Sequence, residues 1–342
     1  MRFILIVFLV LAAVAGLMVF LRKKLLQAKR PGVHREDFPG TIYEVGQGLV
    51  GHRAAQGTRR AVVVAIHGFM EDWRYFANLY ANPALELALV NNSLYHCPDQ
   101  LKPREKPTWA KPNPFAPGTI AHDAHNLCEA LSHFGQPGIT RVHGHSRGGA
   151  VVLEAALQRP ELFADVDVVL EAPLLPGAQP HPSVRFAFSP VGMYCIPFIY
   201  ALLSLVPTGR LMARMNPPIH ERKIRYLGTI SSNPSTWQAV DVNVRNMAQW
   251  LMERHPSQLG ALPRGMVLLA EKDMILDNRS LEAALAQAKH LTVVQPANTS
   301  HFVTLDRPEV LPQPGQQHPA PAIPPKGVIQ LQGGSAGQAN DP

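Results

Sequence analysis

The feature that most constrains this chain is a serine that stands between two glycines and two apolar runs. Residues 141–153 read RVHGHSRGGAVVL, so Ser146 has Gly144 and Gly148 two positions to either side. The residues before it favour a strand, and those after it favour a helix that stops near Pro160. Glycines let a strand and a helix approach closely where a Cβ would clash. We therefore expect a sharp turn that presents the Ser146 hydroxyl, although an ordinary turn of small residues would have the same pattern.

Short apolar runs alternate with helical patterns between residues 31 and 310. This alternation is typical of an α/β fold in which helices cover a mostly parallel sheet. The predicted strands are Thr41–Val45, Ala61–Ile66, Leu94–Cys97, Ile139–Val142, Val166–Leu170, Met266–Ala270 and Leu291–Val294, and the predicted helices are Ile120–Phe134, Ala150–Leu157 and Leu281–Ala288. With 342 residues, the chain is long enough for one such domain with a sizeable core.

Two segments interrupt this alternation. Residues 100–118 are rich in proline and lysine and predict a long surface loop, whereas residues 175–255 are too long for a single connection. Within the second segment, Phe186–Val206 is apolar but contains Pro190 and Pro197. A second membrane span is one interpretation. The prolines, which would break the run into short pieces, favour an apolar excursion over the sheet.

The N-terminus carries an uninterrupted apolar run, Phe3–Leu21. As a helix this run would be about 28 Å long, close to the roughly 30 Å hydrocarbon core of a bilayer. A cleavable signal peptide is the alternative, but no small-residue cleavage site follows the run. Instead it is followed by the basic residues Arg22–Lys24 and Lys29–Arg30. We expect residues 1–30 to form a single-pass anchor with the body on the cytoplasmic side, a periplasmic or extracellular body being the alternative.

Composition excludes several other classes of protein. The net charge is +7, but the basic residues are scattered, with no basic stripe interleaved with aromatic residues, so we expect no nucleic-acid partner. Three cysteines are too few and too separated for a disulfide framework or a metal site, and no metal or organic cofactor is expected. Proline, glycine, glutamine and alanine dominate residues 311–342, which predicts a disordered tail.

A serine nucleophile needs a base, and the base needs a group that orients it. Of the fifteen histidines, His301 follows a predicted strand, so it lies at the carboxyl edge, where open α/β sheets place their chemistry. Three carboxylates, Glu271, Asp273 and Asp277, follow another predicted strand. The order of Ser146, acid and histidine, each after a strand, favours a catalytic site over three unrelated solvated loops.

Two backbone amides are candidate donors for an oxyanion. The residues HGFM, at 67–70, follow a predicted strand, and Gly68 permits a tight bend that turns the N–H of Phe69 inward. The N–H of Arg147 lies next to Ser146 at the start of a predicted helix, where the helix dipole favours negative charge.

Taken together, four motifs resemble those of the α/β-hydrolases over roughly residues 41–306. They are HGF after a third strand, GHSRGG at the turn, EKD after a later strand and SHF near the end. The resemblance implies an α/β-hydrolase fold, with a mostly parallel central sheet flanked by helices. It also implies the following roles: nucleophile Ser146, base His301, acid Asp273, and backbone oxyanion donors Phe69 and Arg147.

The resemblance further implies a hydrolase domain over residues 31–310 with an inserted cap at about 175–255. Two features depart from the family pattern. Asp99 is followed by Gln-Leu-Lys-Pro-Arg instead of a turn that contains glycine. After His301, only Arg307–Leu311 could add helix, which predicts a looser loop around the histidine.

The function expected from these features is that of a membrane-anchored serine hydrolase. It would cleave carboxylic esters, lipid or other acyl esters above all, through an acyl-enzyme on Ser146, and residues 3–21 would bind the bilayer. A thioesterase or an acyltransferase would use the same triad and the same intermediate. An inactive hydrolase fold that serves as a binding module is the alternative from a different class, and fluorophosphonate labelling of Ser146 separates the two.

Overall fold

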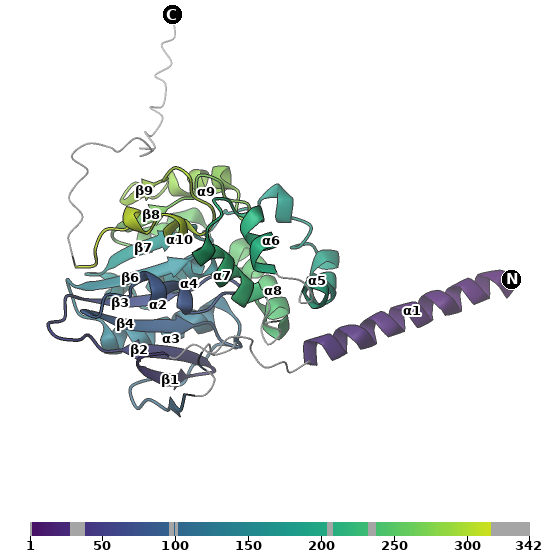
Figure 1. Ribbon diagram of the computed structural model, residues 1–342, viewed down its shortest axis with the longest axis horizontal. Helices are drawn as coiled ribbons and strands as arrows, with labels where there is room; N and C mark the ends of the chain where they lie inside the picture. The colour runs from purple at the N-terminus through teal and green to yellow at the C-terminus, as the bar shows by residue number, and fades with distance from the viewer. Residues whose placement is uncertain are drawn as a thin grey trace, which may run out of the picture.

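A computed structural model of the chain describes residues 2–27, 38–95, 99, 102–203, 208–231 and 237–315. In these residues a nine-stranded sheet forms the centre of the molecule, in the order β5-β1-β2-β4-β3-β6-β7-β8-β9 (Figure 1). The strands are β1 Thr41–Val45, β2 Gly48–Arg53, β3 Ala61–Ile66, β4 Leu85–Asn91, β5 Arg104–Glu105, β6 Thr140–His145, β7 Asp167–Glu171, β8 Gly265–Leu268 and β9 Leu291–Val294. The pairs β1–β2 and β2–β4 are antiparallel and the other pairs are parallel, which confirms the predicted α/β class.

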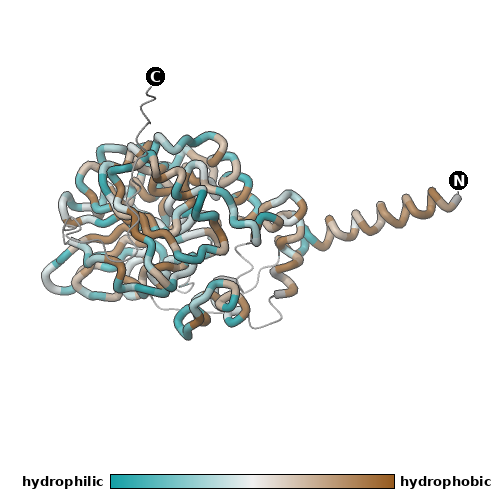
Figure 2. The backbone as a smooth tube through the Cα atoms, turned by 90° about the horizontal axis from the view of Figure 1, so that it is seen from above, coloured by the Kyte–Doolittle hydropathy of each residue, from teal (hydrophilic) through white to brown (hydrophobic). Residues whose placement is uncertain are grey.

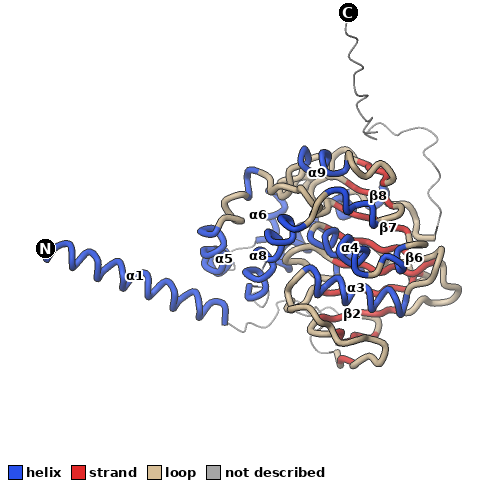
Figure 3. Tube along the Cα trace, turned by 180° about the vertical axis from the view of Figure 1, so that it is seen from behind, coloured by secondary structure: helices blue, strands red, loops and turns tan. Residues whose placement is uncertain are grey.

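Helices cover both faces of this sheet. The α-helices are α1 Arg2–Gln27, α2 Arg74–Leu79, α3 Ile120–Phe134, α4 Arg147–Gln158, α5 Pro190–Leu203, α6 Thr208–Met215, α7 Glu221–Ser231, α8 Trp237–Glu253, α9 Asn278–Leu285 and α10 Val303–Asp306. Short 3-10 helices span Pro160–Phe163, Pro182–Val184, Pro256–Ala261 and Pro308–Val310. Figure 3 shows α3 and α4 in front of the strands on the face seen from behind.

Strand β3 shows why both faces are covered. All of its residues are buried. Val62, Val64 and Ile66 belong to the apolar core that includes α3 and α4, whereas Val63 and Ala65 belong to the core that includes α2 and α10. Successive residues of a strand point to opposite faces, so a strand buried on both sides needs a continuous apolar run. The AVVVAI run meets that requirement.

Strand β4, beside β3, and strand β2, on the other side of β4, differ from the predictions. The fourth strand is Leu85–Asn91, fully buried and parallel to β3, whereas the prediction of a strand at Leu94–Cys97 is wrong. Leu94 lies in a turn, and residues 96–98 lie outside the described residues. Leucine, alanine and glutamate favour helices in isolation, so burial between β2 and β3 decides the conformation of β4. Strand β2 is also absent from the predicted strands, because its two glycines disfavour a strand in isolation.

Between β7 and β8 the chain leaves the sheet and forms an insert, residues 172–264, which contains α5 to α8 (Figure 1). The prediction that prolines break the apolar run into short pieces is wrong. Pro190 occupies the first position of α5, where its missing N–H costs nothing, and the helix continues through Pro197. At 14 residues, α5 is shorter than the roughly 20 residues that a membrane-spanning helix needs.

The N-terminal helix α1 has 26 residues and extends away from the body as a predominantly apolar rod (Figure 2). It is long and apolar enough to cross a membrane, and a signal sequence near an N-terminus would have the same character. The end of α1 contacts the insert. Arg22 Nε donates to the Tyr194 carbonyl at 3.3 Å, and the Arg22 guanidinium lies 3.7 Å from the Asp241 carboxylate.

The first residues of the predicted tail pack against the domain. Leu311 is buried, and the buried Arg141 donates from Nη1 to the carbonyl of Pro312 at 2.6 Å. The remainder of the predicted tail, residues 316–342, lies outside the described residues.

Candidate active site

Ser146 occupies a strained turn between the end of β6 and the start of α4. Its φ of 52° and ψ of −119° lie in a region that non-glycine residues rarely adopt and that costs about 1–3 kcal/mol. The surrounding backbone holds it there, because Ser146 N–H donates to Glu171 O at 2.9 Å and Leu174 N–H donates to Ser146 O at 2.8 Å.

The two glycines beside Ser146 are required by close packing. A Cβ on Gly144 would lie 2.5 Å from the carbonyl oxygen of Gly148. A Cβ on Gly148 would lie 2.3 Å from the carbonyl oxygen of Ile66, the last residue of β3. Real Cβ atoms do not approach backbone so closely, so the spacing of glycine, serine and glycine follows from the geometry of the junction.

His301 and Asp273 form a buried pair at the carboxyl edge of the sheet, on the loops that follow β9 and β8. His301 Nδ1 lies 2.7 Å from Asp273 Oδ2. Burial alone would raise the pKa of Asp273, but the charge and hydrogen bond of His301 and the N–H groups of Leu276 and Ile275 lower it. An ionised Asp273 holds the proton on Nδ1 and leaves Nε2 of His301 as the basic nitrogen.

The other two candidate acids serve the local structure. Glu271 is exposed and accepts a hydrogen bond from the Asn298 N–H at 2.7 Å. Asp277 caps the N-terminus of α9, because its Oδ2 accepts from the Ser280 N–H at 3.1 Å. Of the three carboxylates, Asp273 is therefore the one that contacts a candidate base.

The side chain of His145, the residue before Ser146, contacts the loop that carries His301. Among the described residues, the Ser146 hydroxyl makes no hydrogen bond to His301. The residue before the serine, His145, places Nε2 3.0 Å from the carbonyl oxygen of His301. This contact ties the residue before the candidate nucleophile to the backbone of the candidate base.

The candidate oxyanion turn packs directly on the serine. A Cβ on Gly68 would lie 2.8 Å from the Cβ of Ser146. The amides around Phe69 have partners, since Gly68 N–H donates to Glu71 at 3.1 Å and Met70 N–H donates to the Tyr95 hydroxyl at 2.9 Å. Within the described part of the chain, the Phe69 N–H has no acceptor, which leaves it available to a ligand.

The second candidate donor is the N–H of Arg147, the first residue of α4. The first N–H groups of a helix have no acceptor within the helix, so this N–H is not used inside α4. The Arg147 side chain has a separate structural role that the sequence pattern does not indicate. Its buried guanidinium donates from Nη1 to Asp123 Oδ2 at 2.7 Å. Burial would raise the pKa of Asp123, but Arg147 lowers it, so this buried pair stays ionised and fixes the start of α4.

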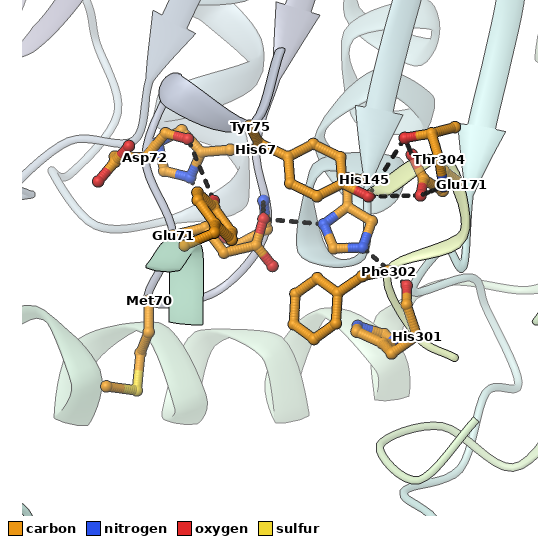
Figure 4. Close-up of polar contacts among 12 residues, drawn as sticks. His67, Met70, Glu71, Asp72, Tyr75, His145, Glu171, His301, Phe302 and Thr304 are labelled. Carbon is orange, nitrogen blue, oxygen red and sulfur yellow. Dashed lines mark hydrogen bonds and ion pairs between the residues drawn. The ribbon is translucent and has the colours of Figure 1, made fainter. Parts of the chain in front are cut away.

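Sequence reasoning also missed a buried polar network beneath the site (Figure 4). Glu171, the last residue of β7, accepts from the Tyr75 hydroxyl at 2.5 Å and from the Thr304 N–H at 2.6 Å. Burial would raise the pKa of Glu171, but the His143 hydrogen bond and the positive charge on His145 lower it to about 2. The one available signal was the pair of histidines, His143 and His145, that directly follows the predicted strand Ile139–Val142 and lies on the observed strand β6.

The loop that carries His301 is tied to the insert, although the α10 helix after it has only four residues. Lys223 of α7 is fully buried, and its Nζ lies 2.5 Å from Asp306 Oδ1 and 2.9 Å from Ser300 Oγ. Ser300 in turn donates to Asp306 from its N–H at 2.8 Å and its hydroxyl at 2.7 Å. The expectation of a looser loop is therefore wrong.

The described residues contain no cluster of three or more His, Cys, Asp or Glu side chains that could hold a metal ion. The arrangement brings together a hydroxyl on a strained turn, an imidazole oriented by a carboxylate, and the backbone N–H groups of the oxyanion turn and of the start of α4.

Comparison with known proteins places this chain in a family. A family model described as the alpha/beta hydrolase family matches residues 63–311. No curated protein matches the chain in sequence.

Three solved structures illustrate the likeness. A 2-hydroxy-6-oxo-6-phenylhexa-2,4-dienoate hydrolase from Rhodococcus sp. strain RHA1 superposes with a TM-score of 0.55 and 19% identity, over 79% of this chain and 94% of the other. A membrane phospholipase A, titled a bacterial virulence factor, gives a TM-score of 0.53 and 19% identity over 90% and 94%. An esterase from Rhodococcus sp. ECU1013 gives a TM-score of 0.51 and 15% identity over 79% and 95%.

At these identities the solved structures show a shared fold, and the match over residues 63–311 shows the family. The family and its hydrolase and esterase neighbours support a hydrolase. The chain belongs to the alpha/beta hydrolase family.

Proposed function

We propose that the chain is a serine hydrolase that cleaves carboxylic esters through an acyl-enzyme on Ser146. The observation that carries this proposal is the 2.7 Å pair of His301 and Asp273 beside a serine held in a strained turn. His301 Nε2 takes the hydroxyl proton as Ser146 attacks the ester carbonyl, and ionised Asp273 stabilises the imidazolium that forms. The N–H groups of Phe69 and Arg147 receive the negative oxygen.

Collapse of this intermediate expels the alcohol, which takes its proton from His301, and leaves the acyl group on Ser146. Water then attacks the acyl carbon while His301 again accepts a proton. As the bond between the acyl carbon and Ser146 Oγ breaks, His301 returns this proton to the serine, so the carboxylic acid is released and the hydroxyl is regenerated. The buried Asp273 remains ionised, because the charge and hydrogen bond of His301 and the N–H groups of Leu276 and Ile275 lower its pKa.

Fluorophosphonate labelling of the full-length protein tests this proposal directly. We expect mass spectrometry to find the label on Ser146 and expect the Ser146→Ala variant to remain unlabelled. The exposed Ser257→Ala variant is the matched control and should label like the wild type. A folded wild-type protein that does not label would favour the inactive binding module instead.

Support for an acyl or lipid ester as substrate comes from the insert. The buried Met70 of the oxyanion turn belongs to the same apolar cluster as the buried Ile196 of α5. Phe69, Phe188 and Met193 pack against that cluster. The insert therefore contributes apolar side chains to the cluster that contains Met70 of the oxyanion turn, and we propose that the acyl chain of the substrate lies along them. One structural neighbour is titled a membrane phospholipase A.

Catalytic efficiency is expected to rise from acetyl to octanoyl nitrophenyl esters. Each buried methylene contributes about 0.8 kcal/mol, so burial of about two further methylenes raises kcat/KM roughly tenfold. The variant Met193→Ala should lower the octanoyl-to-acetyl ratio about fivefold, whereas Leu202→Ala, on the exposed face of α5, should leave it unchanged. A flat chain-length profile that neither variant alters would argue for small polar esters.

We further propose that α1 anchors the protein in a bilayer, with the hydrolase domain on the side of Arg22 and the basic residues that follow it. Deletion of residues 1–30 is expected to move the protein from the membrane pellet to the supernatant, because it removes the apolar helix. Hydrolysis of a soluble short-chain ester should stay within about twofold of wild type, since no proposed catalytic residue is deleted. If the truncated protein still pelleted, the exposed apolar residues Phe186, Val191 and Leu202 would be the second contact to test.

A further inference from the structure

His145 is held between two hydrogen-bond acceptors. Its Nδ1 lies 2.8 Å from Glu71 Oε2, and its Nε2 lies 3.0 Å from the carbonyl oxygen of His301 (Figure 4). A carbonyl oxygen and a carboxylate oxygen can only accept hydrogen bonds. Both contacts are satisfied together when both ring nitrogens carry protons, that is, when His145 is an imidazolium.

The contact with Glu71 reaches the oxyanion turn. The same oxygen, Glu71 Oε2, accepts the Gly68 N–H at 3.1 Å. Gly68 precedes Phe69, whose N–H is the candidate oxyanion donor. A single buried ring therefore connects the turn that carries the donor to the backbone of His301.

Aromatic rings enclose this cation. The Tyr75 ring stacks on the His145 ring, with centroids 4.6 Å apart and planes 13° apart, and the Phe302 ring centroid lies at 5.6 Å. Aromatic faces attract cations, most strongly away from water, and His145 is fully buried. The ring consequently has little freedom to rotate out of its two hydrogen bonds.

We propose that His145, as an imidazolium, is a positioning residue that sets the distance between the oxyanion turn and His301. It acts through Glu71 on one side and through the His301 carbonyl on the other, without contacting substrate. This inference rests on the proposed serine-hydrolase function. The inference adds His145 to the residues needed for turnover, and it requires the positive charge of His145 as well as its shape.

Five titratable groups face His145, and the two carboxylates among them favour its charged form. Glu71 lies on the loop after β3, Glu171 ends β7, Tyr75 lies on α2, His301 follows β9, and His143 lies on the same strand, β6. Burial lowers the pKa of His145, but the charge and hydrogen bond of Glu71 and the charge of Glu171 raise it to about 9. A raised pKa means that the imidazolium and its stabilising contacts are complete below pH 6.5 and are lost as pH rises through about 9.

The test measures kcat and KM of the full-length protein in detergent from pH 5 to 10. Wild type is expected to lose kcat above about pH 9, with KM within about twofold. Glu71→Gln keeps an oxygen acceptor but removes the charge, so the alkaline limb should move down by about three pH units, and kcat at pH 7 should fall about tenfold. Glu86→Gln is the matched control: it alters a similar 2.9 Å contact, with His52, at a distance from the site, and should leave the profile unchanged.

A second measurement does not depend on turnover. Nitrogen-15 NMR of the histidine rings should find both nitrogens of His145 protonated at pH 7 in wild type, the signal being assigned by its loss in His145→Gln or its shift in Glu71→Gln. A neutral His145 at pH 7 would overturn the inference, as would an unmoved alkaline limb in folded Glu71→Gln. If either of these two results is found while Ser146 still labels normally, this inference is wrong and the proposed function stands. If wild-type Ser146 does not label, the proposed function is wrong, and this inference falls with it.

Discussion

Replacing Ser146 or His301 by alanine is expected to lower kcat for ester hydrolysis by about 10⁴-fold or more, and the double variant should be little slower than either single one. The proton leaves the Ser146 hydroxyl for His301 in the same step in which the serine attacks, so loss of one partner makes the other useless. The measurement is kcat per correctly folded molecule, with the folded fraction taken from the thermal melt of each variant.

Exposed residues of the same types provide the controls for this double-mutant cycle. His255→Ala and Ser257→Ala alter the exposed N-terminus of a 3-10 helix and should leave kcat within about twofold. If the losses in Ser146→Ala and His301→Ala multiplied in the double variant, the two residues would act independently, and the acyl-enzyme mechanism would have to be abandoned.

The second large effect is expected at Asp273. Asp273→Asn should lower kcat by about 10⁴-fold, because an asparagine NH₂ facing Nδ1 favours the wrong tautomer and places the proton on Nε2, where the base is needed. The ion pair with His301 disappears with the charge.

Because the pKa of Asp273 is lowered in the folded protein, its contribution to stability is present above the ordinary value of 3.8 and lost as pH falls below it.

Glu271→Gln and Asp277→Asn are the matched carboxylate controls and should reduce kcat only a few-fold. The glutamine at 271 still accepts the Asn298 N–H, and the asparagine at 277 still caps α9. Steady-state kinetics of the three variants at one pH separates the acids. A collapse of kcat in Glu271→Gln, with Asp273→Asn unaffected, would transfer the role of the acid to Glu271.

The parts of the fold that could be predicted are those in which local pattern and tertiary burial agree. The β-branched run of β3 and the apolar spacing of α3 indicate their structures correctly. Strand β4 could not be found, because Leu85–Asn91 has a composition that favours helix, and its burial between two neighbours overrides that preference. Pro197 predicts a break in the apolar run, but α5 continues through it as a helix.

The candidate site divides in a similar way. The positions of Ser146, Asp273 and His301 at the carboxyl edge of the sheet could be predicted, because each follows a strand that the sequence indicates. The network of Glu71, His145 and Glu171 could not, because its members lie on three segments that meet only when β3, β6 and β7 are adjacent in the sheet. Strand order is a property of the whole fold, and no local spacing in the sequence encodes it.

The buried contact between Lys223 and Asp306 has a consequence for engineering. Chimeras that exchange the insert between relatives are a natural way to transfer substrate preference, since the insert enters and leaves the sheet at only two points. In such a chimera the residue at position 223 comes from the donor protein, because it lies in the insert. Asp306 and Ser300 lie outside the insert and come from the recipient protein. A donor insert without the lysine would leave Asp306 buried without its main cationic partner, and such a loss typically destabilises a protein by 3–5 kcal/mol. A successful graft must therefore carry residues 300–306 along with the insert, although they lie outside it in the sequence.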